Sequence, residues 1–139
     1  MPPNNPRADR IPGRRAYGGL LLVPVLCNES ERLYFLVDTG ASLTAITDRT
    51  AKRLTIDLGR PLRTQTIACP GLRMLSVPVV RIRSLRIGTL DITDLEVPVI
   101  AFPQGLRLDG LLGVNVLQRF RPTLEFDTGT LVLRARSAS

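Results

Sequence analysis

The stretch Phe35-Leu36-Val37-Asp38-Thr39-Gly40-Ala41-Ser42 decides how the rest of this sequence is interpreted. Its first three residues are apolar and typical of a buried strand, and they are followed by a carboxylate, a small hydroxyl residue and a glycine. A buried strand tends to end at a turn, so Asp38-Thr39-Gly40 could be a turn and nothing more. A strand that ends in an acid is also what a carboxylate site requires, because burial and a neighbouring like charge help a carboxyl group to keep its proton. Both interpretations are open on this segment alone.

Strand-like segments surround this stretch and are separated by Gly, Pro, Asn and Asp turn signals, a pattern that predicts an all-β domain. The expected strands cover residues 18–26, 32–37, 62–68, 72–87, 90–101 and 123–133, the last as a hairpin. Near Ser84 the apolar alternation slips, so we expect a bulge or a kink there. Two segments predict short helices: Thr47–Leu54, which opens with a capping threonine, and Val114–Phe120, which stops before Arg121-Pro122.

The N-terminal segment differs in composition from the rest. Residues 1–16 carry four prolines and four arginines but almost no large apolar side chains. Such a segment buries too little apolar surface to offset the entropy of ordering it. We therefore expect a basic, flexible tail over residues 1–16 and a single domain over residues 17–139.

Two separate motifs carry a family resemblance. Asp38-Thr39-Gly40-Ala41-Ser42 resembles the active-site loop of the aspartic proteases, whose signature is Asp-Thr/Ser-Gly-Ala/Ser. Asp109-Gly110-Leu111-Leu112-Gly113-Val114 resembles the hydrophobic-hydrophobic-Gly loop that threads behind the active-site strand in that family, although alone it would be a turn leading into a core helix. Together, in this order, they identify the chain as similar to the retropepsin-like, single-lobe aspartic proteases over residues 18–133. The resemblance implies a closed β-barrel with one short C-terminal helix, assembled as a homodimer.

The same resemblance implies a mechanism. One motif per chain supplies one carboxylate, so the two-carboxylate site needs a second copy, with the two Asp38 residues on a two-fold axis. One Asp38 would activate a water, the other would polarise the scissile carbonyl, Thr39 would hydrogen-bond across the interface, and Gly40 would offer its backbone to the substrate. The related enzymes also join their chain ends in an intersubunit sheet, for which residues 130–134 are the candidate strand, unless that strand pairs only within one protomer.

The same tripeptide occurs again at Asp127-Thr128-Gly129, but there we do not interpret it as a catalytic motif. Pepsin-type enzymes carry two such motifs in one chain, but each motif is followed by its own flap and its own hydrophobic-hydrophobic-Gly segment. Only residues 130–139 follow Gly129, and the flanking segments 124–126 and 130–133 predict two strands joined by a tight turn. We therefore assign catalysis to Asp38, Thr39 and Gly40.

Residues 62–74 occupy the place of the flap, the hairpin that covers bound peptide in the related enzymes, with Pro70-Gly71 as a turn signal. This segment is not glycine-rich as retroviral flaps are, and an ordinary surface hairpin is the alternative. Ser42-Leu43 stands where retroviral enzymes carry acidic residues, which favours the cellular and bacterial branch of the family. The residues expected to bind substrate are Leu36, Ala41, Ser42, Leu43, Ile67, Ala68, Cys69, Pro70, Gly71, Leu111 and Leu112.

Composition excludes several other chemistries. The chain has no histidine, so Ser-His-Asp and Cys-His mechanisms are absent and acid/base chemistry falls to carboxylates. Cys27 and Cys69 have no Cys-x-x-Cys spacing, so we expect two buried or free thiols, no metal and no other cofactor. The longest apolar run, residues 20–26, is too short to span a membrane and unlike a signal peptide, so a cytoplasmic protein is expected.

Two rival functions stay open at this stage. The net charge is +7, but the nineteen basic residues, all arginine except Lys52, are scattered along the expected strands, which does not favour nucleic-acid binding unless they gather on one face. A catalytically weak or inactive module that binds partners through the same fold is the other rival, since a fold does not fix a function. The intact Asp38 motif favours a peptidase that acts on peptides or proteins.

Overall fold

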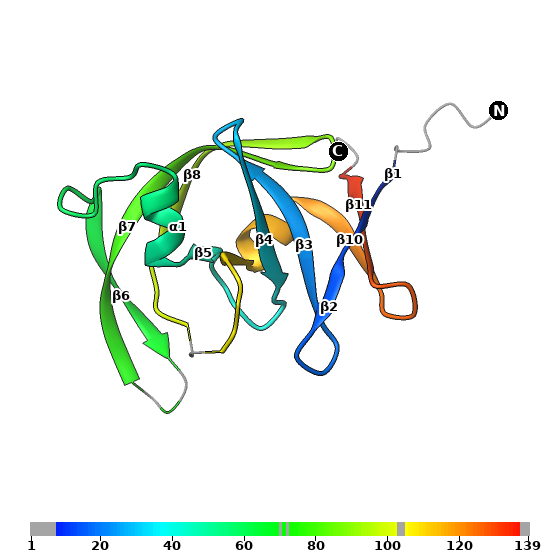
Figure 1. Ribbon diagram of the computed structural model, residues 1–139, viewed down its shortest axis with the longest axis horizontal. Coiled ribbons are helices and arrows are strands. Elements are labelled where there is room, and N and C mark those ends of the chain that lie inside the picture. Colours follow the sequence, from blue (N-terminus) through cyan, green and yellow to red (C-terminus); the bar gives the residue numbers. More distant parts are fainter. Residues whose placement is uncertain (1–7, 70, 72, 103–104, 137–139) are drawn as a thin grey trace.

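The computed structural model of the chain describes residues 8–69, 71, 73–102 and 105–136. Within them the chain is mostly β, as expected, with short helices (Figure 1). The strands are β1 Ala8–Pro12, β2 Arg14–Ala16, β3 Leu20–Cys27, β4 Glu31–Val37, β5 Ala45–Ile46, β6 Arg63–Cys69, β7 Arg73–Ile87, β8 Leu90–Pro98, β9 Gly110–Leu112, β10 Phe120–Glu125 and β11 Thr130–Ala135. The helices are α1 Asp48–Arg53 and α2 Val114–Leu117.

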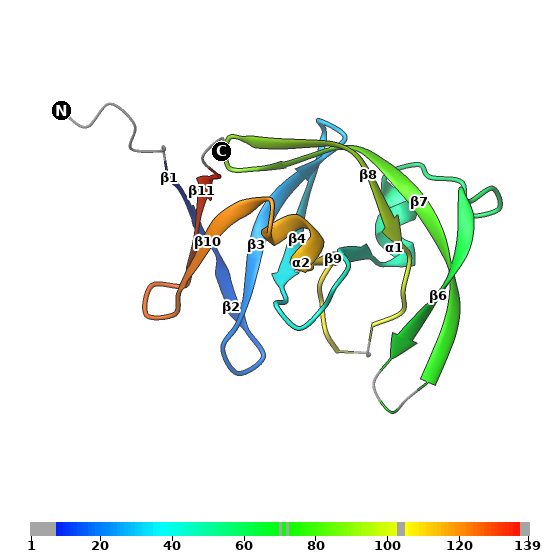
Figure 2. The same cartoon turned by 180° about the vertical axis from the view of Figure 1, so that it is seen from behind.

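A three-stranded antiparallel sheet has the order β1-β11-β10 and lies at one end of the molecule, opposite the β6–β7 hairpin (Figures 1 and 2). The expected tail over residues 1–16 is wrong for residues 8–16, because β1 pairs with β11 and β2 pairs with β3. Apolar Ile11 explains the error, since it is 4% exposed and packs into the core from a segment that is otherwise polar. Asp9 adds an anchor by accepting hydrogen bonds from the backbone N and the hydroxyl of Thr89.

Strand β11 occupies the centre of this sheet, with β1 on one edge and β10 on the other. The expectation that residues 130–134 present a free edge to a second copy is therefore wrong in this structure. Leu131 and Leu133 are fully buried on the inner face of the sheet. The strand is thus part of the protomer's own core.

The larger sheet has the path β5-β9-β4-β3-β7-β6, with β2 added on β3 and β8 added on β7. The expected closed β-barrel is wrong, because the two ends of this sheet do not join in a ladder. A single bridge, Ile46 to Val99, links β5 to the residue that follows β8. Strand β5 is only two residues long, since the chain turns at Thr47 to begin α1, and so it cannot extend the pairing that closure would need.

The core lies between these sheets and is built almost entirely from aliphatic side chains. Its largest fully buried members come from seven strands. They include Phe35 on β4, which pairs with Gly110, and Leu112 on β9, which pairs with Val37 in the same parallel ladder. Burying a side chain of this kind contributes about 1.5–3 kcal/mol. Apolar packing therefore contributes to holding β4 against β9, in addition to the hydrogen bonds between the two strands.

The helices and β10 refine the expected boundaries. Thr47 caps α1 by accepting a hydrogen bond from Thr50 N, as predicted. The second helix is shorter than expected and ends at Leu117, because β10 already begins at Phe120. Pro122 lies within β10, opposite Leu133, which is possible because β10 is an edge strand and proline needs no partner there.

The expected irregularity near Ser84 is present as a gap in the β7–β8 ladder. Ile82 and Ser84 pair with β8, whereas Arg83 and Asp94 between them are unpaired and Asp94 has φ 53°. The side-chain oxygen of Asn28 accepts hydrogen bonds from the backbone N of Arg83 and of Ser84. The turn between β3 and β4 thus takes up the backbone groups that the ladder leaves out.

Candidate active site

Asp38 lies immediately after β4, at the point where the parallel pairing of β4 with β9 ends. Its backbone N donates to the carbonyl of Leu112 at 3.0 Å, which ties the loop to β9. One carboxylate oxygen accepts from the backbone N of Gly40 at 3.0 Å, so the acid is oriented by its own loop. Asp38 is half-buried, while Thr39 and Gly40 are exposed. The three residues assigned to catalysis therefore sit together, with the outer side of the loop open.

Gly113 allows the segment after β9 to pass directly behind this loop. A Cβ at this position would lie 2.5 Å from the carbonyl carbon and oxygen of Leu43, so only glycine fits without a shift of backbone. Two hydrogen bonds then join the segments, from Val114 N to the carbonyl of Ala41 at 2.8 Å and from Asn115 N to the carbonyl of Ser42 at 3.2 Å. The predicted close approach of these two segments is what the structure contains.

Thr44 and Asn115 form a buried polar link that the sequence analysis missed. Thr44 is fully buried, and its backbone N and hydroxyl both donate to the side-chain oxygen of Asn115, at 2.8 and 2.9 Å. The Thr44 hydroxyl also accepts from Gly113 N at 3.0 Å. Such a link rigidifies a site, because a buried polar group without a partner costs free energy. Its only sequence signal is a threonine placed between Leu43 and Ala45 in an apolar run.

Asp109 is the other carboxylate in this region, and it has a structural role. Its side chain accepts from Tyr34 N at 2.9 Å, and its backbone N donates to the carbonyl of Tyr34 at 3.0 Å. Its carbonyl accepts from Thr47 N and from the hydroxyl of Thr50, at the start of α1. Asp109 therefore continues the β4–β9 pairing and positions α1.

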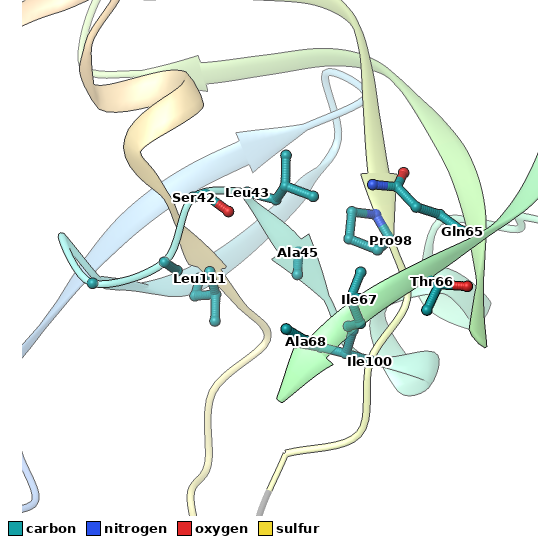
Figure 3. A pocket seen from close by; sticks show the side chains of 12 residues that line it. Ser42, Leu43, Ala45, Gln65, Thr66, Ile67, Ala68, Pro98, Ile100 and Leu111 are labelled. Atoms are coloured by element: carbon teal, nitrogen blue, oxygen red, sulfur yellow. The ribbon is translucent and has the colours of Figure 1, made fainter. Parts of the chain in front are cut away.

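A cavity of about 360 Å³ lies between the loop after Asp38 and the β6–β7 hairpin (Figure 3). Six of the residues expected to bind substrate line it together with Gly40: Ala41, Ser42, Leu43, Ile67, Ala68 and Leu111. Five other residues line it that were not predicted from the sequence: Ala45, Gln65, Thr66, Pro98 and Ile100. These come from β5, from β6, and from the end of β8 and the residues just after it, none of which carries a recognisable motif.

The other described residues that were expected to bind substrate do not line this cavity. Leu112 is fully buried in the core, and half-buried Leu36 is not among the residues that line the cavity. Gly71 is exposed at the turn between β6 and β7. Pro70 and the side chain of Cys69 lie outside the described part of the chain. Strand alternation explains Leu112, since it points to the opposite side of β9 from Leu111, which lines the cavity.

Asp127-Thr128-Gly129 forms the turn between β10 and β11, as predicted. Gly129 has φ 68°, and its backbone N donates to the carbonyl of Glu125 at 2.9 Å. Asp127 and Thr128 are exposed, and Arg15 donates to the carbonyls of Phe126 and Asp127. The second tripeptide is therefore a hairpin turn in a different part of the molecule from Asp38.

Other candidate chemistries find little support in the described residues. Cys27 is fully buried, and burial raises the pKa of its thiol to about 12, with the charges of Asp109 and Glu31 adding to the shift. A thiol of that kind stays protonated and is not a nucleophile. No cluster of acidic and cysteine side chains suited to a metal ion occurs in residues 8–69, 71, 73–102 and 105–136. In the same ranges, neither helix is long and apolar enough to cross a membrane.

Comparison with known proteins assigns the family. The family model described as aspartyl protease matches residues 23–116, a range that contains both the Asp38 loop and Gly113. The chain belongs to the aspartyl protease family. No curated protein shows a significant match to the chain.

Solved structures place this family member in the retropepsin-like group. A retropepsin-like aspartic protease from Rickettsia conorii matches with a TM-score of 0.70 and 26% sequence identity, over 93% of this chain and 92% of that one. The retroviral protease-like domain of Ddi1 from Leishmania major matches with a TM-score of 0.56 and 18% identity, over 87% of this chain and 97% of that one. The second likeness, at its low identity, concerns the fold alone.

Proposed function

We propose that this chain is one half of an aspartic endopeptidase, in which two copies bring their Asp38 side chains together. The observation that carries the proposal is the geometry of the Asp38 loop. It is braced from behind by Leu112 and Gly113, while Thr39 and Gly40 are exposed on its outer side. None of the described residues that line the adjoining cavity carries a carboxylate, so the cavity supplies no second acid to Asp38. A second copy that approaches from the exposed side would supply the missing acid.

Two carboxylates at hydrogen-bonding distance share one proton, because like charges so close cannot both ionise. The ionised member of the pair takes a proton from a water held between them, and the water attacks the scissile carbonyl. The protonated member polarises that carbonyl and later helps to protonate the leaving amine. The Gly40 N–H that holds one oxygen of Asp38 keeps the carboxylate in a fixed orientation for both steps.

The second copy cannot pair through β11, whose two edges are occupied within the protomer. The outer edges of β1 and β10 are the unpaired edges of the three-stranded sheet. We place the dimer contact at the exposed Thr39–Gly40 loop and along one of these edges. The substrate then lies between the two Asp38 loops and the β6–β7 hairpins, as an extended strand whose side chains alternate between subsites.

The test compares three proteins on an unbiased peptide library: wild type, Asp38→Asn and Asp127→Asn. We expect Asp38→Asn to lose at least about 100-fold in cleavage rate, the range in which a general acid or base contributes. The exposed Asp127 should tolerate its substitution within about twofold. The pH profile should be acidic and bell-shaped, because one carboxyl of the pair is charged and the other protonated.

Protein concentration gives the matching control for the two-chain site. Specific activity should fall on dilution, together with the dimer fraction measured by sedimentation, since each protomer holds half of the site. Equal and complete loss in both aspartate variants, or full activity of a monomer, would contradict the proposal. Folded protein that binds peptides without cleaving them would favour the rival function, a binding module on the protease fold.

A further inference from the structure

The cavity beside the Asp38 loop is neutral. Among the described residues that line it, none carries a charge. Its apolar members are Ala41, Leu43, Ala45, Ile67, Ala68, Pro98, Ile100 and Leu111, and three polar side chains join them: Ser42, Gln65 and Thr66. A charged side chain placed here would lose its hydration without gaining a partner charge, which is costly. The cavity therefore suits an uncharged side chain.

Gln65 is the longest polar side chain in this lining. It lies on β6 opposite Val77, which is only 8% exposed, so the two share the inner face of the β6–β7 hairpin. Figure 3 shows Gln65 reaching over Pro98 from the hairpin side, while Ser42 faces the cavity from the side of the Asp38 loop. In the described part of the chain the Gln65 amide makes no hydrogen bond, although the side chain is half-buried.

An amide in this position affects which substrate binds best. When a peptide fills the cavity, it removes water from the Gln65 amide. An aliphatic substrate side chain then leaves both the donor and the acceptor of that amide without partners, whereas a carboxamide can pair with both. The apolar walls, such as Leu43 and Leu111, still accept the methylene groups of a glutamine. The expected order is therefore a carboxamide first, an aliphatic side chain second and a charged side chain last.

We propose that Gln65 is the specificity-determining residue of this cavity and that it selects a substrate side chain ending in a carboxamide, glutamine above all. The inference rests on the proposed peptidase function and adds to it the chemistry of one subsite.

The experiment uses peptides that differ at one position near the scissile bond and carry Gln, Leu, Lys or Glu there. For wild type we expect kcat/KM with Gln to exceed the value with Leu by roughly tenfold, the size of effect that an unpaired buried amide produces. Gln65→Leu should reverse this order in favour of Leu. Gln65→Glu should raise the value with Lys above that with Glu, because the new carboxylate pairs with the ammonium group.

Thr64 provides the matched control, since it is the exposed neighbour of Gln65 on β6 and does not line the cavity. Thr64→Leu and Thr64→Glu should leave the wild-type order of the four peptides unchanged. An unchanged order in both Gln65 variants, or the same shift in the Thr64 variants, overturns the proposal.

A binding measurement separates this inference from the proposed function. Peptides whose scissile bond is replaced by a reduced amide are titrated into Asp38→Asn protein, with and without Gln65→Leu, by calorimetry. The preference for Gln should appear in the affinities of Asp38→Asn and disappear in the double variant, even if no peptide is cleaved by any form. Equal affinities for the Gln and Leu peptides in Asp38→Asn would overturn the role of Gln65 and leave the peptidase proposal standing.

Discussion

The same tripeptide, Asp-Thr-Gly, occurs at residues 38–40 and at residues 127–129 and has two different structures. The first follows a core strand, and the carbonyl of Leu112 holds its backbone from behind. The second connects β10 and β11 at the surface, where Gly129 takes φ 68° and bonds back to Glu125. Asp38 is half-buried beside a cavity, whereas Asp127 is exposed. The tripeptide therefore has no structure of its own, and the segment that packs behind it decides which form it takes.

The largest effect expected from this comparison comes from ending the chain after Gly129. This truncation removes β11, so β1 and β10 lose their shared partner and the fully buried Leu131 and Leu133 are lost. Each such leucine contributes about 2–5 kcal/mol, and a domain of this size is stable by about 5–15 kcal/mol. We expect the truncated chain not to fold, as measured by circular dichroism and thermal melting.

Ending the chain after Arg136 is the control, because it keeps the whole of β11. This longer form should melt at the wild-type temperature. If the chain that ends at Gly129 stayed folded and became monomeric, β11 would be a dimer strand and the pairing within the protomer would be of minor importance. That outcome would also reopen the assignment of the second tripeptide to a simple hairpin.

An intermediate effect is expected from substituting alanine for two glycines: Gly113, which packs behind the first tripeptide, and Gly129, which belongs to the second. In Gly113→Ala the new methyl group meets the backbone of Leu43 at 2.5 Å, and we expect a loss of about 3 kcal/mol in stability together with a displaced Asp38 loop and lower activity. In Gly129→Ala the strain comes from the left-handed backbone and costs about 1–2 kcal/mol. This second variant should keep its activity once folded.

Thermal melting and peptide cleavage, measured on both glycine variants, separate the two kinds of damage. A Gly113→Ala protein with wild-type activity would show that the close approach behind Asp38 is not needed for catalysis. Loss of activity in folded Gly129→Ala would instead connect the second hairpin to the site. Either result would remove the distinction between the two tripeptides on which the assignment of Asp38 depends.

Much of the fold could be predicted from local sequence motifs, because each of these motifs is compatible with few backbone structures. The strand end at Asp38, the close approach at Gly113 and the turn at Asp127 were predicted, because each belongs to a segment whose sequence allows few alternative structures. The helix cap at Thr47 was predicted for the same reason. In each of these cases the information lies within a few residues of the position concerned.

The errors concern features that depend on distant pairing. Ile11 and Leu131 come from opposite ends of the chain, and their pairing in register across β1 and β11 leaves no trace in either segment. Whether the two ends of the larger sheet join depends on the length of β5, and the start of α1 sets that length. Gln65 was missed because a polar residue on an alternating strand can face either solvent or a cavity, and only the register with Val77 decides.

The smallest expected effect concerns the ion pair that holds the second hairpin to β1. Hydrogen bonds from Arg10 lower the pKa of Glu125, partial desolvation opposes this shift, and the charge of Arg10 reinforces it. A carboxyl group whose pKa is lower in the folded state stabilises the fold above its unfolded pKa, which is about 4.3, and this contribution is lost as the pH falls through the folded value. The effect should be small, since Arg10 is exposed and Glu125 is partly exposed to water and salt.

Melting temperatures of wild type and Glu125→Gln, measured from neutral to strongly acidic pH, test this linkage. Other carboxylates also titrate in acid, but their contribution is common to both proteins and cancels in the difference. Wild type should melt higher at neutral pH, and the difference should shrink below pH of about 4. Arg10→Gln should remove the same pH dependence, because it takes away the partner that lowers the pKa of Glu125. A difference that is constant across the whole range would mean that the charge of Glu125 does not contribute to the stability of the fold.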